Sequence, residues 1–251
     1  MAQSRWLTSR ILQLDPLVEK KDYQKLRAEL QLVADAYVAL GKKHPGEAKI
    51  RPFQAYAYKR LGAVEGVLGN YAVGIGWYEK AMELHRLLKD RMGESTCEVD
   101  IAWALQRQGK INEAKAAMDR SMVIRRELAA VSGKDQQSKL SLVSVMFRKA
   151  ILFEEEKRWG EGLALLEEAS VILKAMEGDM KQNRSIGEVI QQVELMRGDA
   201  LWESGRRAEA RTAYARGLAV DVGRGWEPVR ISRARQRVGQ PGSNGPALPL
   251  Q

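Results

Sequence analysis

The 251-residue sequence predicts an all-α protein in which antiparallel helix hairpins stack into a right-handed superhelix, an α-solenoid. Three observations indicate this class. The chain has no proline between Pro52 and Pro228, and this part is rich in Ala, Leu, Glu, Lys, Arg, Gln and Met, which favour helices. The sequence lacks runs of alternating apolar and polar residues, which are typical of strands. Small residues also recur at matched intervals, as in repeat architectures.

The first 52 residues predict two helices, which we interpret as N-terminal helices of a degenerate capping repeat. Residues 4–14 form a short amphipathic segment that ends at Asp15-Pro16. In residues 17–40, apolar residues follow at steps of three and four, as on one face of a helix: Tyr23, Leu26, Leu30, Val33, Tyr37 and Leu40. Gly41 is predicted to end this helix, because glycine tolerates the backbone of helix C-termini.

Four helix hairpins are predicted over residues 53–224. Their helices are expected at 53–68 and 70–90, 94–108 and 111–130, 136–156 and 159–176, and 186–203 and 206–220. Glycine marks the turn in three hairpins, at Gly69, Gly109 and Gly205, whereas the third hairpin has Lys157. After the hairpins we expect a linker, a basic capping helix within residues 225–238 that begins at Pro228, and a disordered tail over 239–251.

The hairpins share a pattern of residue sizes. Each has a small residue in its first helix: Gly62, Ala102, Ala150 and Gly198. Twelve residues later comes a small residue of the second helix: Gly74, Ala114, Gly162 and Ala210. A large apolar residue and another small one follow: Tyr78 and Ala81, Met118 and Ser121, Leu166 and Ala169, Tyr214 and Gly217. Glycine inside a helix costs about 1 kcal/mol relative to alanine, so this pattern indicates helices that cross closely.

These motifs resemble the tetratricopeptide repeat family. The best unit contains Leu61-Gly62, Gly69-Asn70-Tyr71, Gly74, Tyr78 and Ala81. The markers recur after 40, 48 and 48 residues, which is longer than the 34 usual for the family, and the proline that commonly closes a repeat is absent. Long units that end like residues 121–130 are similar to repeats appended to bacterial serine/threonine kinases. The resemblance implies a non-catalytic scaffold for protein–protein interaction, acting as a regulatory module in a bacterial signalling system.

Residues with catalytic or metal-binding chemistry are sparse, so we expect no enzyme activity, no cofactor and no metal. The single Cys97 excludes an internal disulfide. His44 and His85 are interpreted as solvated histidines, and the Glu154-Glu155-Glu156 run as a solvated helix end. The glycine-rich stretch at 66–76 lacks the Gly-Lys-Ser/Thr of a phosphate loop, and kinase signatures are missing. No apolar run could span a bilayer, and we expect a soluble, cytoplasmic protein.

In the resembling family, the first helices of the hairpins line a concave groove. Helical spacing therefore predicts a partner-binding set on these helices: Lys59, Val99, Trp103, Gln106, Arg107, Phe147, Ile151, Asp199, Trp202 and Glu203. Trp103, Phe147 and Trp202 are either anchors for a partner or packing residues between repeats, and packing is the favoured interpretation for Phe147. Lys59 stands where the family's carboxylate clamp has lysine, but Ala63 replaces its asparagine, so a peptide held by mixed apolar and charged contacts is favoured.

The formal net charge of +9 is concentrated near the C-terminus, where residues 204–238 contain nine arginines, no lysine and three acidic residues. A basic patch is predicted from eight of them: Arg206, Arg207, Arg211, Arg224, Arg230, Arg233, Arg235 and Arg237. Nucleic acid or an acidic partner is one alternative function, through phosphate or carboxylate neutralisation. Self-association of a structural subunit is another, and the oligomeric state is left open.

Overall fold

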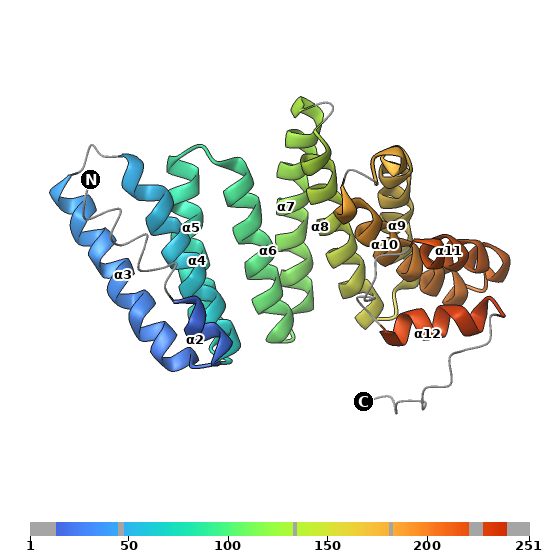
Figure 1. The fold of residues 1–251 in the computed structure, drawn as a ribbon, viewed down its shortest axis with the longest axis horizontal. Coiled ribbons are helices and arrows are strands. Elements are labelled where there is room, and N and C mark those ends of the chain that lie inside the picture. The colour runs from blue at the N-terminus through green and yellow to red at the C-terminus, as the bar shows by residue number, and fades with distance from the viewer. Residues whose placement is uncertain (1–13, 45–47, 133–134, 181–182, 221–227, 240–251) are drawn as a thin grey trace. The chain divides into compact units, whose positions relative to one another are not determined.

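The computed structural model describes residues 14–44, 48–132, 135–180, 183–220 and 228–239. In these ranges every regular element is a helix, and no strand occurs. The chain divides into two compact units, residues 1–128 (the N-terminal unit) and 129–251 (the C-terminal unit). Each is described by itself (Figure 1).

In the N-terminal unit, consecutive helices pack against one another in antiparallel pairs. They are α2 (Asp15–Glu19), α3 (Tyr23–Lys43), α4 (Arg51–Val67), α5 (Tyr71–Leu87), α6 (Arg91–Arg107) and α7 (Ile111–Ser132), with a short 3-10 helix at Ala48–Ile50. The last turn of α7 belongs to the C-terminal unit. The helix predicted at 17–40 is interrupted at Lys21, whose φ is 55°. Gly41 does not end α3, which continues to Lys43.

In the C-terminal unit, two more hairpins are followed by one short helix. They are α8 (Gln136–Glu155) with α9 (Trp159–Lys174), then α10 (Arg184–Glu203) with α11 (Arg207–Ala219), and finally α12 (Pro228–Arg237). A 3-10 turn at Glu177–Asp179 precedes α10. The prediction of helical hairpins over 53–220 is therefore confirmed, and α12 begins at Pro228. The segment predicted at 4–14 and nearly all of the tail lie outside the described residues.

The turns within the four hairpins share one backbone conformation. Gly69, Gly109 and Gly205 have φ of 83°, 75° and 80°, and Lys157 has φ of 57°. Around Gly69, the Gly69 N–H donates to the Gly66 carbonyl (3.1 Å) and the Asn70 N–H to the Glu65 carbonyl (2.8 Å), the bonding of a Schellman motif. The Lys157 turn has the same two bonds. A lysine therefore adopts the left-handed conformation that glycine takes elsewhere.

The recurring small residues lie where helices touch. An ideal β-carbon on Gly198 would be 2.4 Å from the ring of Tyr214, and one on Gly62 would be 2.6 Å from the ring of Tyr78. The second and third hairpins have Met118 and Leu166 in place of these tyrosines. Their small residues, Ala102 and Ala150, are alanines instead of glycines. All eight residues of these four pairs are buried. The size pattern therefore reflects glycine opposite tyrosine and alanine opposite a smaller apolar residue.

Across the described ranges, none of the helices has the length and apolar character needed to cross a membrane.

Candidate protein-binding surfaces

On the N-terminal unit, the first helices of two hairpins present a mixed aromatic and charged surface. The Lys59 ammonium lies 3.3 Å from the Asp100 carboxylate and links α4 to α6. Asp100, Trp103 and Arg107 follow at helical spacing on α6 and are at least partly exposed. We define the α4–α6 face by the exposed and half-exposed residues of this surface: Tyr56, Lys59, Arg60, Ala63, Val67, Asp100, Trp103 and Arg107.

Trp103 packs within the unit and also contributes to the α4–α6 face. Its ring meets the ring of Tyr71 edge-on, with centroids 5.8 Å apart. A β-carbon on Gly66 would be 2.5 Å from this ring, so glycine at position 66 makes room for it. Arg107 donates a hydrogen bond to the Tyr71 hydroxyl (3.3 Å). These contacts hold the indole in place, and Trp103 remains partly exposed.

Other members of the predicted partner-binding set are less exposed than the sequence indicated. Val99 and Phe147 are buried, because within their own units α6 packs against α4 and α5, and α8 packs against α9 and α10. This leaves a narrow exposed stripe on each helix, and neither side chain lies on it. Gln106 and Ile151 are half-exposed. Helical spacing alone could not show how wide that stripe is.

In the C-terminal unit, Asp199 of α10 is a buried acceptor for a cluster of donors. Its carboxylate is 1% exposed and accepts from the Tyr214 hydroxyl at 2.7 Å. It also accepts from three arginines of α12: Arg230 at 2.7 Å, Arg233 at 3.2 Å and Arg237 at 3.0 Å. Burial and the hydrogen bond to Asp199 raise the pKa of Tyr214 above its ordinary value, so the phenol stays protonated.

Two of these three arginines also reach two further carboxylates and an indole. Arg230 donates to Glu154 at 3.0 Å and Arg237 to Glu203 at 3.0 Å. The Arg237 guanidinium also lies 4.8 Å from the Trp202 ring centroid, and Arg207 lies 4.1 Å from it. Figure 1 shows α12 along one edge of this unit, with its start close to the end of α8. Glu154 is therefore bound to an arginine and not a solvated end, and Trp202 contacts the chain's own arginines.

The predicted basic patch is mostly engaged with carboxylates. Arg206 donates to Glu209 at 2.5 Å and to Glu167 at 3.3 Å. The hydrogen bond from Arg206 lowers the pKa of Glu209 and raises that of the guanidinium. Arg211 and Arg235 are exposed, and Arg224 lies outside the described residues. Neutralisation of this kind weakens the alternative of phosphate binding.

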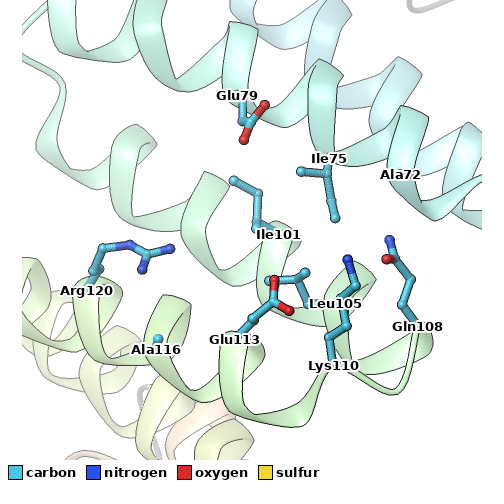
Figure 2. A pocket seen from close by; sticks show the side chains of 10 residues that line it. All are labelled: Ala72, Ile75, Glu79, Ile101, Leu105, Gln108, Lys110, Glu113, Ala116 and Arg120. Atoms are coloured by element: carbon cyan, nitrogen blue, oxygen red, sulfur yellow. The ribbon is translucent and has the colours of Figure 1, made fainter.

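A pocket of about 470 Å³ lies between α5, α6 and α7 in the N-terminal unit (Figure 2). Ile101 and Leu105 of α6 form its buried floor. Its other lining residues come from α5, α7 and the turn between α6 and α7: Ala72, Ile75, Glu79, Gln108, Lys110, Glu113, Ala116 and Arg120. The Nε2 atom of Gln108 is buried and has no hydrogen-bond partner. Sequence reasoning missed this pocket, since it depends on the spacing between two hairpins.

Two ion pairs in which the glutamate is buried, at equivalent places in the second and fourth hairpins, were also missed. Glu98 is 3% exposed and accepts two bonds of 2.8 Å from Arg120, while Glu194 is fully buried and accepts from Arg216 at 3.0 Å. In both hairpins the partners are 22 residues apart. The signal was present, because glutamate and arginine occur at matched positions of these hairpins.

His85 and Cys97 do not form a reactive site. The His85 Nδ1 atom lies 2.8 Å from the Asp90 carboxylate, and its Nε2 atom is buried without a partner, so the interpretation as a solvated histidine is wrong. Burial raises the pKa of the Cys97 thiol to about 12, which disfavours the thiolate. Within the part of the chain that the structure describes, no three His, Cys, Asp or Glu side chains gather to hold a metal ion.

The fold defines a helical-repeat protein built from stacked hairpins, and comparison with known proteins shows which repeats it resembles. Residues 53–127 match the family model for the tetratricopeptide repeat. The structure is similar to BtubC (BKLC) from P. vanneervenii, with a TM-score of 0.65 and 13% identity over 86% of this chain and 82% of that one.

Two further solved structures have the same fold. A candidate kinesin light chain of Podosopora anserina with TPR-like repeats has a TM-score of 0.61 and 17% identity, over 87% of this chain and 95% of that one. The apo form of RapI has a TM-score of 0.58 and 11% identity, over 93% of this chain and 70% of that one. A search of curated proteins by sequence finds no match. Residues 53–127 therefore match the tetratricopeptide repeat by sequence, and the likeness to these solved structures shows a helical-repeat fold over most of the chain.

Proposed function

We propose that this protein is a non-catalytic interaction scaffold whose α4–α6 face binds a peptide or protein segment with apolar and acidic side chains. The observation that carries the proposal is the position of Trp103, which is held by Tyr71 and Gly66 and remains partly exposed beside Arg107. Tryptophan and arginine are the residues most enriched at the energetic centres of interfaces. Because the indole is already fixed, a partner would lose little side-chain entropy in ordering it.

The rest of the α4–α6 face supports a partner of mixed chemistry. Tyr56 is 43% exposed and Val67 is 56% exposed, which gives apolar area for contact. Arg60 of α4 and Arg107 of α6 supply positive charge on the helices that the Lys59–Asp100 ion pair links. An acidic group of the partner would lie beside these cations, while its apolar side chains would cover Tyr56, Val67 and Trp103. Similarity of the long units to repeats appended to bacterial kinases supports a regulatory role.

The proposal is tested by panning a random dodecapeptide library against the full chain. Recovered peptides are expected to carry aromatic or aliphatic residues together with Asp or Glu. Their affinity is then measured by fluorescence polarisation for the Arg107→Gln and Val67→Ser variants, which alter the α4–α6 face. Because Arg107→Gln also removes the hydrogen bond to Tyr71, its thermal stability is compared with that of the natural chain. We expect each variant to weaken binding by about five- to fiftyfold, the loss of one favourable contact.

Matched controls separate this face from other surfaces. Arg126→Gln removes an exposed arginine of α7 in the same unit and should leave affinity unchanged. Trp103→Ala should weaken binding further, but it also removes packing against Tyr71, so its circular dichroism and thermal stability must be compared first. If peptides bind both face variants and the control equally well, the α4–α6 face is not the binding site.

A further inference from the structure

Helix α12 docks on the C-terminal unit by its arginines and with little apolar contact. Of its ten residues only Ala234 is buried. Val229 is 54% exposed. Arg230, Arg233 and Arg237 point to one acidic surface, which we define by Glu154, Asp199, Trp202 and Glu203. Apolar burial, which normally holds a helix in place, is nearly absent from this contact.

We propose that this acidic surface is a docking site for an arginine-bearing helix of a protein partner, and that α12 occupies it as an internal competitor. The surface is formed by the C-terminal ends of α8 and α10, which are the first helices of their hairpins. Helix C-termini carry partial negative charge and favour cations. Asp199, Trp202 and Glu203, expected from the sequence to contact a partner, here contact the chain's own helix.

Because Asp199 is buried, replacing α12 by a partner helix is more favourable than releasing α12 and leaving the surface empty. When α12 leaves, Asp199 retains the Tyr214 hydroxyl but loses all three guanidinium groups. An uncompensated carboxylate in this position is costly until water or another cation reaches it. A partner helix with its own arginines restores those contacts as α12 departs. The structure therefore favours displacement by a ligand of the same chemistry over an empty surface.

The geometry also defines the sequence that such a partner needs. The three arginines of α12 are at positions i, i+3 and i+7, which lie on one face of a helix. The first reaches Glu154 and Asp199, the second Asp199, and the third Asp199, Glu203 and the Trp202 ring. Arginine suits these positions better than lysine, because its planar fork can bond two carboxylates and stack on an indole at once.

This inference concerns the C-terminal unit and does not rest on binding at the α4–α6 face. A failure of either proposal leaves the other standing.

The test of the α12 proposal uses a fluorescein-labelled peptide with the sequence of residues 228–238, PVRISRARQRV. The protein is the full chain, either with its natural sequence or with Arg230→Gln, Arg233→Gln and Arg237→Gln combined. Fluorescence polarisation gives the affinity, and hydrogen–deuterium exchange reports whether α12 is docked.

The triple variant is expected to show faster exchange over residues 228–237 and to bind the peptide at least tenfold more tightly than the natural chain does. Raising NaCl from about 50 to 500 mM should weaken this binding, since the Debye length falls below the spacing between exposed charges. A peptide with glutamine at the three arginine positions should not bind. The Arg235→Gln variant, which removes an exposed arginine of the same helix, should behave like the natural chain.

Two further measurements keep the proposal testable if the triple variant does not fold. Excess peptide added to the natural chain should accelerate exchange within its own α12, and Asp199→Asn should abolish peptide binding. The proposal is overturned if α12 is released in the triple variant but the peptide does not bind. It is also overturned if the Asp199→Asn variant binds the peptide as tightly as its parent does. Binding of a random oligonucleotide, but not of the peptide, to the surface that α12 has left would overturn it too.

Discussion

The ring of Tyr78 fills the space that a β-carbon on Gly62 would occupy, with the nearest ring atom 2.6 Å from that position. Tyr214 stands in the same relation to Gly198, at 2.4 Å. Both rings are buried and belong to the second helix of a hairpin whose first helix carries the glycine. The crossing distance of these two hairpins is therefore set by a glycine–tyrosine contact.

Gly62→Ala and Gly198→Ala should both destabilise the protein. The added methyl group forces a rigid buried ring to move, an overpacking effect of about 1–3 kcal/mol that outweighs the gain in helix propensity of about 1 kcal/mol. Urea denaturation followed by circular dichroism at 222 nm measures the free energy of unfolding. Gly76→Ala, where a β-carbon would meet nothing within 4 Å, is the control and should be stabilising. Equal behaviour of the three variants would contradict this account.

Gly74→Ala and Gly162→Ala should change stability in opposite directions, although the two glycines hold equivalent positions. A β-carbon on Gly74 would be 2.9 Å from the Gly62 carbonyl oxygen, whereas one on Gly162 would be 3.5 Å from the Ala150 carbonyl oxygen. The first contact requires the helix backbones to separate and should cost about 1 kcal/mol net. The second is ordinary contact, so alanine should stabilise by about 0.5–1 kcal/mol. Thermal melting of the two variants shows whether each change in stability is a gain or a loss.

Lys157→Gly should stabilise the third hairpin. Lys157 has φ of 57°, a conformation that costs a side-chain-bearing residue about 1 kcal/mol and that glycine adopts freely. Part of this gain is offset by the greater freedom of glycine in the unfolded chain, so we expect about 0.5 kcal/mol in chemical denaturation. Gly109→Lys, the reverse change in the second hairpin, should destabilise by a similar amount. A loss of stability in Lys157→Gly would show that the lysine makes a contact that outweighs its backbone strain.

The Cys97 thiol should be unreactive in the folded protein. Burial raises its pKa to about 12 from an ordinary value of 9.0. Because the folded pKa is the higher one, the thiol contributes stability that is fully present below about pH 9 and is lost as the pH rises toward 12. Ellman's reagent at pH 8 should label Cys97 only after addition of denaturant. Rapid labelling of the native chain at that pH would show that the helix around Cys97 opens readily.

Removal of Arg120 should cost more stability than removal of the whole ion pair. Arg120→Leu leaves the Glu98 carboxylate, whose side chain is 4% exposed, without its guanidinium. Since the Arg120 side chain is about half exposed and water can screen the charge, we expect a loss of roughly 1–3 kcal/mol. The double change Glu98→Met and Arg120→Leu should recover most of it. A double-mutant cycle from urea denaturation measures the coupling, and additive losses would mean that the pair contributes nothing.

Sequence periodicity predicted the hairpins well, because helix formers, turn residues and small contact residues are local signals. It did not predict the break at Lys21, where a lysine adopts a positive φ. The residues of the candidate binding surfaces were harder to predict from the sequence. Val99 is buried although Asp100 and Trp103 of the same helix are partly exposed. Its burial depends on how much of α6 the other helices cover, which the sequence does not show. Trp202 was predicted to be either an anchor or a packing residue. Its ring contacts Arg207 and Tyr214 of α11 and Arg237 of α12, and the contact with α12 could not be read from helical spacing on α10.

The Glu98–Arg120 and Glu194–Arg216 pairs restrict how this array can evolve. The third hairpin has Met146 and Glu168 at the matching positions, so replacing the fourth hairpin with a copy of the third would leave Ser170 without the carboxylate that it now meets at 2.5 Å. Such a copy would also deprive Glu177 of the arginine that now pairs with it. Repeats of this kind are not interchangeable modules. Recombination that duplicates or deletes a single hairpin should be selected against, while changes confined to the exposed stripes remain free to follow a changing partner.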